Sequence, residues 1–100
     1  MNDNLLETIS TSTKPVLVEF YATWCPHCRA MMPVMNRLVD ETKEMATVAQ
    51  IDGDKDEALV EKFHVHSYPT FILFKDGQEA WRDSGEKPYS ELKDMIDRFA

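Results

Sequence analysis

The chain has 100 residues, a length typical of one domain with one hydrophobic core, and we expect residues 1–100 to form a single domain. Apolar residues make up 43% of the sequence and charged residues 29%, proportions that exclude disordered and low-complexity proteins. The formal net charge of −7 repels phosphate backbones and anionic lipids, which excludes nucleic acid and membrane surfaces as favoured partners.

The first fifth of the chain predicts a short amphipathic helix followed by a buried strand. Asp3 or Asn4 would cap the helix, and the hydroxyl side chains at 10–13 would end it. Residues 16–21 are aliphatic or aromatic on both alternating faces except at Glu19, a pattern typical of a central strand covered on both sides. Glu19 is therefore expected to be buried, and burial would raise its pKa.

The next segment predicts a helix and a second strand joined by a crossover. The helix would run from Cys25 to about Lys43, with a kink at Pro33 inside it. Residues 47–51 predict the second strand, and a strand, helix, strand succession of this length implies a parallel, right-handed connection. Three methionines of this helix are expected to pack in the core or along the helix: Met31, Met32 and Met35.

The second half of the chain predicts a helix, a β-hairpin and a final helix. The acidic run at 52–57 is more typical of a solvated loop and helix start than of a calcium site. Asp76-Gly77 separates residues 70–75 from residues 78–82, which predicts a hairpin. Ser90 is expected to cap the last helix. This order predicts an α/β domain with one mixed sheet of about four strands and helices on both faces.

Two cysteines, Cys25 and Cys28, point to redox chemistry by their spacing and position. They lie where a strand ends and a helix begins, and the positive end of a helix favours Cys25 as thiolate. Pro26 suits the first helical position because it lacks an N–H group. Cys28 would lie on the same helix face, where it could attack a mixed disulfide formed at Cys25. His27 would donate a hydrogen bond or positive charge to the Cys25 thiolate.

Further landmarks surround this pair along the chain. They are Glu19, Trp24, Pro33, Tyr68-Pro69-Thr70, Phe74-Lys75-Asp76-Gly77 and a later Gly85. Together with the Cys-x-x-Cys motif, this set resembles the thioredoxin family over almost the whole chain. The resemblance implies a thioredoxin fold, here with a first edge strand that is short or absent, because about seven residues are missing before the first long strand.

The resemblance also implies an activity, partners and roles for individual residues. The protein would be a thiol-disulfide oxidoreductase in which Cys25 attacks a substrate disulfide, Cys28 resolves the mixed disulfide and Glu19 accepts a proton. It would act on protein disulfides without a cofactor or metal, be recycled by a thioredoxin reductase-type donor, and work as a cytoplasmic monomer. The residues implied to hold substrate are Trp24, Tyr68, a cis Pro69, Thr70 and Gly85.

Three features depart from the usual thioredoxin pattern. Pro26-His27 replaces the usual Gly-Pro dipeptide and is similar to the disulfide-inserting branch of the superfamily, which predicts a stronger oxidant. Glu19 replaces the usual buried Asp and is one methylene longer. Gln50 stands where a Lys often neighbours that acid, so no positive charge at this position would hold the Glu19 pKa down.

Two alternative functions remain open from the residues alone. A metal-binding or metallochaperone module would use Cys25, Cys28 and a histidine, although zinc usually takes four ligands and the chain has one cysteine pair. A redox-inert interaction domain is the other alternative. His64 and His66 are expected to be ordinary loop residues, and Trp81 a packing residue. The first seven residues lack a basic run followed by an apolar region, so cytoplasm is the default location.

Overall fold

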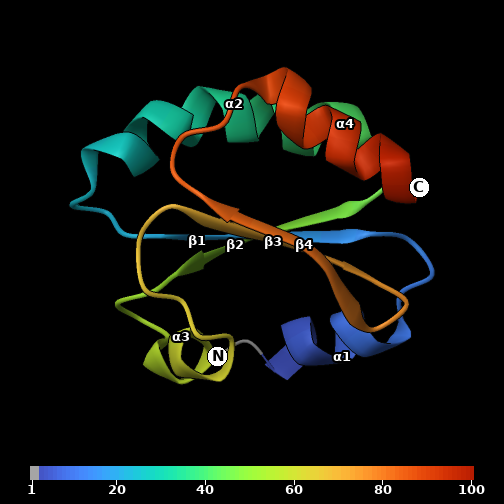
Figure 1. The fold of residues 1–100 in the computed structure, drawn as a ribbon, viewed down its shortest axis with the longest axis horizontal. Helices are drawn as coiled ribbons and strands as arrows, with labels where there is room; N and C mark the ends of the chain where they lie inside the picture. The colour runs from blue at the N-terminus through green and yellow to red at the C-terminus, as the bar shows by residue number, and fades with distance from the viewer. Residues whose placement is uncertain (1–2) are drawn as a thin grey trace.

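A computed structural model describes residues 3–100, in which a four-stranded sheet lies between two layers of helices (Figure 1). The strand order is β2-β1-β3-β4; β1 pairs parallel with β2 and antiparallel with β3, and β3 pairs antiparallel with β4. The predicted mixed sheet is confirmed, and within residues 3–100 no strand precedes β1. The strands are β1 (Val16–Tyr21), β2 (Thr47–Asp52), β3 (Thr70–Lys75) and β4 (Gln78–Ser84).

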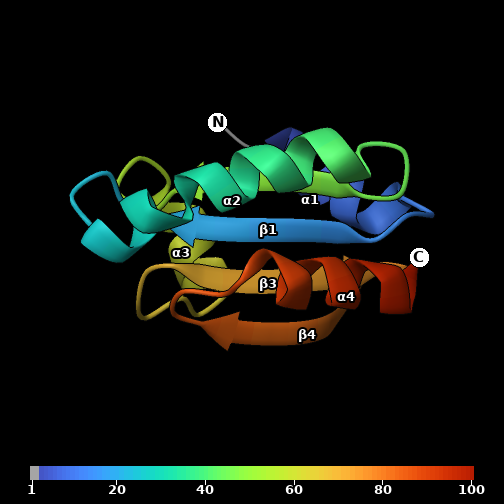
Figure 2. The same ribbon diagram turned by 90° about the horizontal axis from the view of Figure 1, so that it is seen from above.

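The helices cover both faces of the sheet. One face carries α1 (Asp3–Thr11) and α3 (Glu57–Lys62), and the other carries α2 (Pro26–Thr42) and α4 (Tyr89–Phe99) (Figure 1). Figure 2 shows α2 and α4 side by side along the sheet, with α4 nearer to β3 and β4. None of the helices within 3–100 is both long and apolar enough to cross a membrane.

Alternation along β1 decides which face receives each side chain. Val16, Val18 and Phe20 belong to the hydrophobic cluster under α1 and α3. Leu17 belongs to the cluster under α2 and α4, so Glu19, two residues later, points to this second face. The period of two therefore places a carboxyl group beneath α2, the helix that begins directly after Cys25.

The ends of several elements differ from the predictions. The Asp76-Gly77 hairpin is confirmed, with φ values of 53° and 78°, but β4 continues to Ser84. Both proposed caps of α1 lie within the helix. Ser90 does not cap α4: the cap position is Pro88, without a side-chain hydrogen bond. The helix starts two residues earlier than a Ser90 cap implies because Tyr89 is held against α2, where its hydroxyl donates to Glu41 at 2.6 Å.

The methionines of α2 divide between the core and the surface. Met31 and Met35 are buried as predicted, and the helix continues through Pro33. Met32 is 56% exposed, so its prediction as a packing residue was wrong. It lines a pocket beside β1. Trp81 is partly buried and packs against the cluster under α2 and α4.

Candidate active site

The first turn of α2 holds the two cysteines in the reduced state. Cys25 is the N-cap residue, and its sulfur accepts a hydrogen bond from the backbone N–H of Cys28 at 3.3 Å. Pro26 occupies the first helical position, as predicted. The sulfur of Cys25 thus satisfies one of the N–H groups that have no partner within the helix, at the end where the helix dipole is positive.

The Cys28 thiol lies in an environment that disfavours its charged form. Burial raises its pKa to about 12, with a smaller contribution from its hydrogen bond with Cys25. A hydrogen bond from the backbone at Ala22 opposes this effect, and the negative charge of Glu19 adds to it. Cys28 therefore needs a proton acceptor before it can act as a nucleophile near neutral pH.

Glu19 is buried in the centre of β1, as predicted, with 2% of its surface exposed. Burial raises its pKa, and a hydrogen bond from the Gln50 side chain partly offsets that increase. The parallel register pairs Glu19 with Gln50, and the Gln50 Nε2 donates to Glu19 Oε1 at 3.1 Å. A neutral donor thus occupies the neighbouring position on β2.

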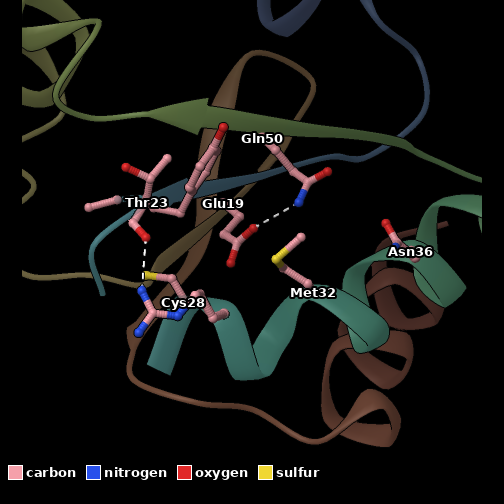
Figure 3. Close-up of a pocket in the computed structure, with 9 residues that line it drawn as sticks. Glu19, Thr23, Cys28, Met32, Asn36 and Gln50 are labelled. Atoms are coloured by element: carbon pink, nitrogen blue, oxygen red, sulfur yellow. Dashed lines mark hydrogen bonds between the residues drawn. The ribbon is translucent and has the colours of Figure 1, made fainter. Parts of the chain in front are cut away.

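A pocket of about 380 Å³ connects the buried acid with the second cysteine (Figure 3). Figure 3 shows the Glu19 carboxyl joined to the Gln50 amide, with the Met32 sulfur beside them and Cys28 on the first turn of α2. The pocket gives Cys28 and Glu19 a shared space in which a proton can be transferred, directly or through water. Its wall is formed by Glu19, Tyr21, Ala22, Thr23, Cys28, Arg29, Met32, Asn36 and Gln50.

The predicted substrate-binding residues gather on the other side of Cys25. The Tyr68-Pro69 peptide bond is cis, as predicted, and Cys25 Sγ donates to the Tyr68 carbonyl at 3.6 Å. Trp24 is 63% exposed beside this bond. Gly85, with φ of 91°, donates its N–H to the Pro69 carbonyl at 2.9 Å. Thr70 is buried, and its hydroxyl donates to the Ser67 carbonyl.

The His27 ring has a different partner from the one predicted. Its Nδ1 lies 2.5 Å from Glu86 Oε2, in an exposed pair that joins the start of α2 to the segment after β4. The hydrogen bonds of the Cys25 sulfur go to the Cys28 amide and the Tyr68 carbonyl. The His27 ring is therefore bonded to Glu86 and not to the Cys25 sulfur.

The remaining histidines stay apart from this cluster. His64 and His66 are exposed loop residues, as predicted, and the carbonyl of His64 accepts a hydrogen bond from Arg82. In the part of the chain that the structure describes, no three His, Cys, Asp or Glu side chains are grouped so that they could hold a metal ion.

Sequence reasoning missed three residues around the site. Asp54, assigned to a solvated acidic run, accepts a hydrogen bond from Trp24 Nε1 at 2.8 Å. Glu86 pairs with His27, and Gly53 contacts the Tyr68 ring. Each contact joins segments that are far apart in the chain, so no local pattern signals it. From the amino-acid sequence alone, Asp54 and Glu86 can be recognised only as carboxylates.

Comparison with known proteins agrees with this geometry. The family model described as Thioredoxin matches residues 1–98. Thioredoxin Y2, chloroplastic, from Arabidopsis thaliana is 42% identical over 95 residues, which cover 95% of this chain and 55% of that protein. The bifunctional thioredoxin reductase/thioredoxin of Mycobacterium leprae is 40% identical over 90 residues, 89% of this chain and 20% of that protein. The chain thus spans about half of the first relative and a fifth of the second.

A solved structure extends the agreement to the fold. The X-ray structure of Fasciola hepatica thioredoxin superposes with a TM-score of 0.86 and 31% identity, covering 99% of this chain and 91% of that one. With a family model that matches nearly all of its residues, and with its two cysteines at the start of α2, the chain belongs to the thioredoxin family.

Proposed function

We propose that the protein is a protein thiol-disulfide oxidoreductase, in which Cys25 is the attacking cysteine and Cys28 the resolving one. The observation that carries the proposal is the placement of Cys25 Sγ as the cap of α2, 3.3 Å from the Cys28 amide nitrogen. Cys28, by contrast, is held protonated by burial. The two thiols of one motif thus have environments suited to the two successive steps.

The reaction transfers two electrons from the protein to a client. The Cys25 thiolate attacks one sulfur of a client disulfide, which forms a mixed disulfide and releases the first client thiol. Cys28 then loses its proton and attacks the Cys25 sulfur. The second client thiol leaves, and Cys25 and Cys28 remain joined by a disulfide bond.

Glu19 is the proton acceptor of the second step in this proposal. Its carboxyl shares the pocket with Cys28, and its raised pKa brings it closer to the range in which a carboxylate exchanges protons at neutral pH. Gln50 orients the carboxyl by its hydrogen bond to Oε1. Trp24, Tyr68 and Gly85 are at least partly exposed and form the surface that receives the client segment, while Pro69 and Thr70 are buried and support this surface.

The oxidised form needs an electron donor for each further turnover. A thioredoxin reductase-type enzyme fits this role, and the relative named as a bifunctional thioredoxin reductase/thioredoxin supports it. A reducing compartment such as the cytoplasm would keep the dithiol available. Residues 1–100 would act as a single monomeric domain. Among the described residues, three large hydrophobic side chains are exposed: Trp24, Met32 and Val39. Trp24 precedes Cys25 and Met32 lines the pocket, so these two border the site.

The test compares two single substitutions in the reduced protein. Cys28→Ser should accumulate mixed disulfides with client proteins, because the first step proceeds and the second is blocked. Cys25→Ser should accumulate almost none. Reduction of insulin disulfides by the wild type, with and without a chelator, checks that turnover needs no metal. Equal trapping by both variants would overturn the assignment of the two cysteines.

A further inference from the structure

Gly53 is in unusually close contact with Tyr68, the residue whose carbonyl is bonded to the Cys25 sulfur. A Cβ atom built on Gly53 would lie 2.0 Å from the Tyr68 hydroxyl oxygen and 2.5 Å from its Cζ. Real Cβ atoms do not approach other atoms this closely, so any larger residue at position 53 would require a movement. The ring of Tyr68 occupies the space that a side chain at position 53 would fill.

The tyrosine ring, not the backbone at position 53, would have to move. The N–H of Gly53 donates to the Tyr21 carbonyl at 2.8 Å, which fixes it to the end of β1. Its φ lies outside the left-handed region, so the backbone itself does not demand glycine. The contact with Tyr68 is therefore the feature that requires glycine at this position.

Tyr68 links this contact to the exposed part of the site. Its ring meets the Trp24 ring edge to face, with centroids 6.1 Å apart and planes at 78°. The Trp24 ring has a second contact, the hydrogen bond that its Nε1 donates to Asp54. The carbonyl of Tyr68 accepts the hydrogen bond from Cys25 Sγ. A displaced Tyr68 ring would thus withdraw the support of Trp24 next to the attacking sulfur.

We propose that Gly53 and Tyr68 form a positioning pair, in which the absent side chain of Gly53 seats the Tyr68 ring and this ring fixes Trp24 as the aromatic wall that receives protein clients. The inference rests on the proposed function, because it concerns how a client reaches Cys25. The pair affects recognition of large disulfide substrates, which contact the wall, more than the reaction at sulfur. A small disulfide makes few contacts with that wall and should depend little on it.

The experiment is a double-mutant cycle with Gly53→Ala and Tyr68→Val. Reduced proteins are mixed with excess insulin or with oxidised glutathione, and the rate is followed against substrate concentration. Each single variant should raise the half-saturating insulin concentration by about two- to tenfold, the loss expected for one aromatic pair. Rates with glutathione should change less than about twofold. Valine leaves room for a Cβ at position 53, so Gly53→Ala should have no further effect in the Tyr68→Val protein.

The outcomes separate this inference from the proposed function. Additive effects of the two substitutions, or equal losses with insulin and glutathione, would overturn the positioning pair. A wild-type protein that reduces neither disulfide would overturn the oxidoreductase function itself. Should Gly53→Ala fail to fold, a folded Gly53→Ala/Tyr68→Val protein supports the pair, whereas an unfolded one contradicts it. Ile96→Val, a change in the core under α4, serves as a control that should leave insulin saturation unaltered.

Discussion

Glu19 is the residue whose environment is most at odds with its chemistry. The carboxyl lies in the middle of a strand, with 2% of its surface exposed, and a neutral amide is its hydrogen-bonding neighbour. Burial of a carboxyl group without a neighbouring cation raises the pKa of that group, and the folded protein loses stability once the carboxyl becomes charged. Retaining an acid there is understandable if it serves the proton transfer from Cys28.

Replacing Glu19 by Gln should separate its cost in stability from its role in the reaction. The folded-state pKa of Glu19 lies above its ordinary value of 4.5. The stability that the protonated carboxyl provides is therefore complete below pH 4.5 and is lost as the pH rises through the folded-state pKa. Glu19→Gln should therefore raise the free energy of unfolding relative to wild type by an amount that grows with pH and then levels off. Denaturant unfolding at pH 4 to 9 measures this difference.

The same substitution should slow resolution of the mixed disulfide. Loss of a general base typically costs ~10²-fold or more in rate. Because burial sets the pKa of Cys28 at about 12, resolution by Glu19→Gln should accelerate with each increase in pH, without the plateau that a carboxylate base gives. Rapid-quench analysis of the mixed disulfide follows this step. Unfolding and resolution both unchanged at pH 8 would mean that Glu19 is an ordinary carboxylate.

Gln50 should set the pH at which Glu19 becomes available. A lysine at position 50 would place a cation near the carboxyl and lower the Glu19 pKa, so the plateau in the resolution rate should begin about one pH unit lower. Gln50→Met removes the hydrogen bond and should move the plateau to higher pH. The two variants thus shift the pH profile in opposite directions. Coincident profiles would show that position 50 does not influence the base.

At the scale of elements, an ion pair joins the start of α2 to the segment after β4. His27 and Glu86 are 70% and 48% exposed, so their contact contributes little to stability. The Glu86 carboxylate nevertheless lies against the helix end that carries Cys25. The negative charge of Glu86 disfavours a thiolate at Cys25, which limits the oxidising strength that Pro26-His27 predicts.

Removing the carboxylate should make the protein a stronger oxidant. Glu86→Gln removes this negative charge, which favours the thiolate and hence the reduced protein, and should raise the reduction potential by about 10–30 mV at low salt. Added salt should reduce the shift, because the pair is exposed. Equilibration with glutathione measures the potential. Glu44→Gln, the same charge change beyond the far end of α2, should give no shift; an equal shift there would show that the pair has no local effect.

Periodicity predicted the elements because it reports on local geometry and burial. The alternation at 16–21 predicted both the central strand and the buried Glu19. Contacts between distant segments decide the features that periodicity did not predict. The start of α4 depends on Tyr89 meeting α2, the exposure of Met32 depends on the pocket beside β1, and the role of Gly53 depends on Tyr68. None of these has a signature in neighbouring residues.

At the scale of the whole molecule, the excess of negative charge should select among clients. The formal net charge is −7, and two carboxylates contact residues that neighbour Cys25 in the chain: Asp54 is bonded to Trp24, and Glu86 is paired with His27. A surface of this sign attracts cationic partners and repels anionic ones over about one Debye length. The approach of a client therefore depends on the charges that flank its disulfide.

Two peptides with the same disulfide, one flanked by lysines and one by glutamates, test this selection. At low ionic strength the lysine peptide should form the mixed disulfide with Cys28→Ser about tenfold faster, because attraction raises the encounter rate. The ratio should fall toward one near 1 M salt, where the Debye length is about 3 Å. The Asp54→Asn/Glu86→Gln protein should show a smaller ratio at low salt, since the charges nearest Cys25 act most strongly. Equal rates for both peptides at low salt would mean that contacts at the aromatic wall, and not charge, decide which clients react.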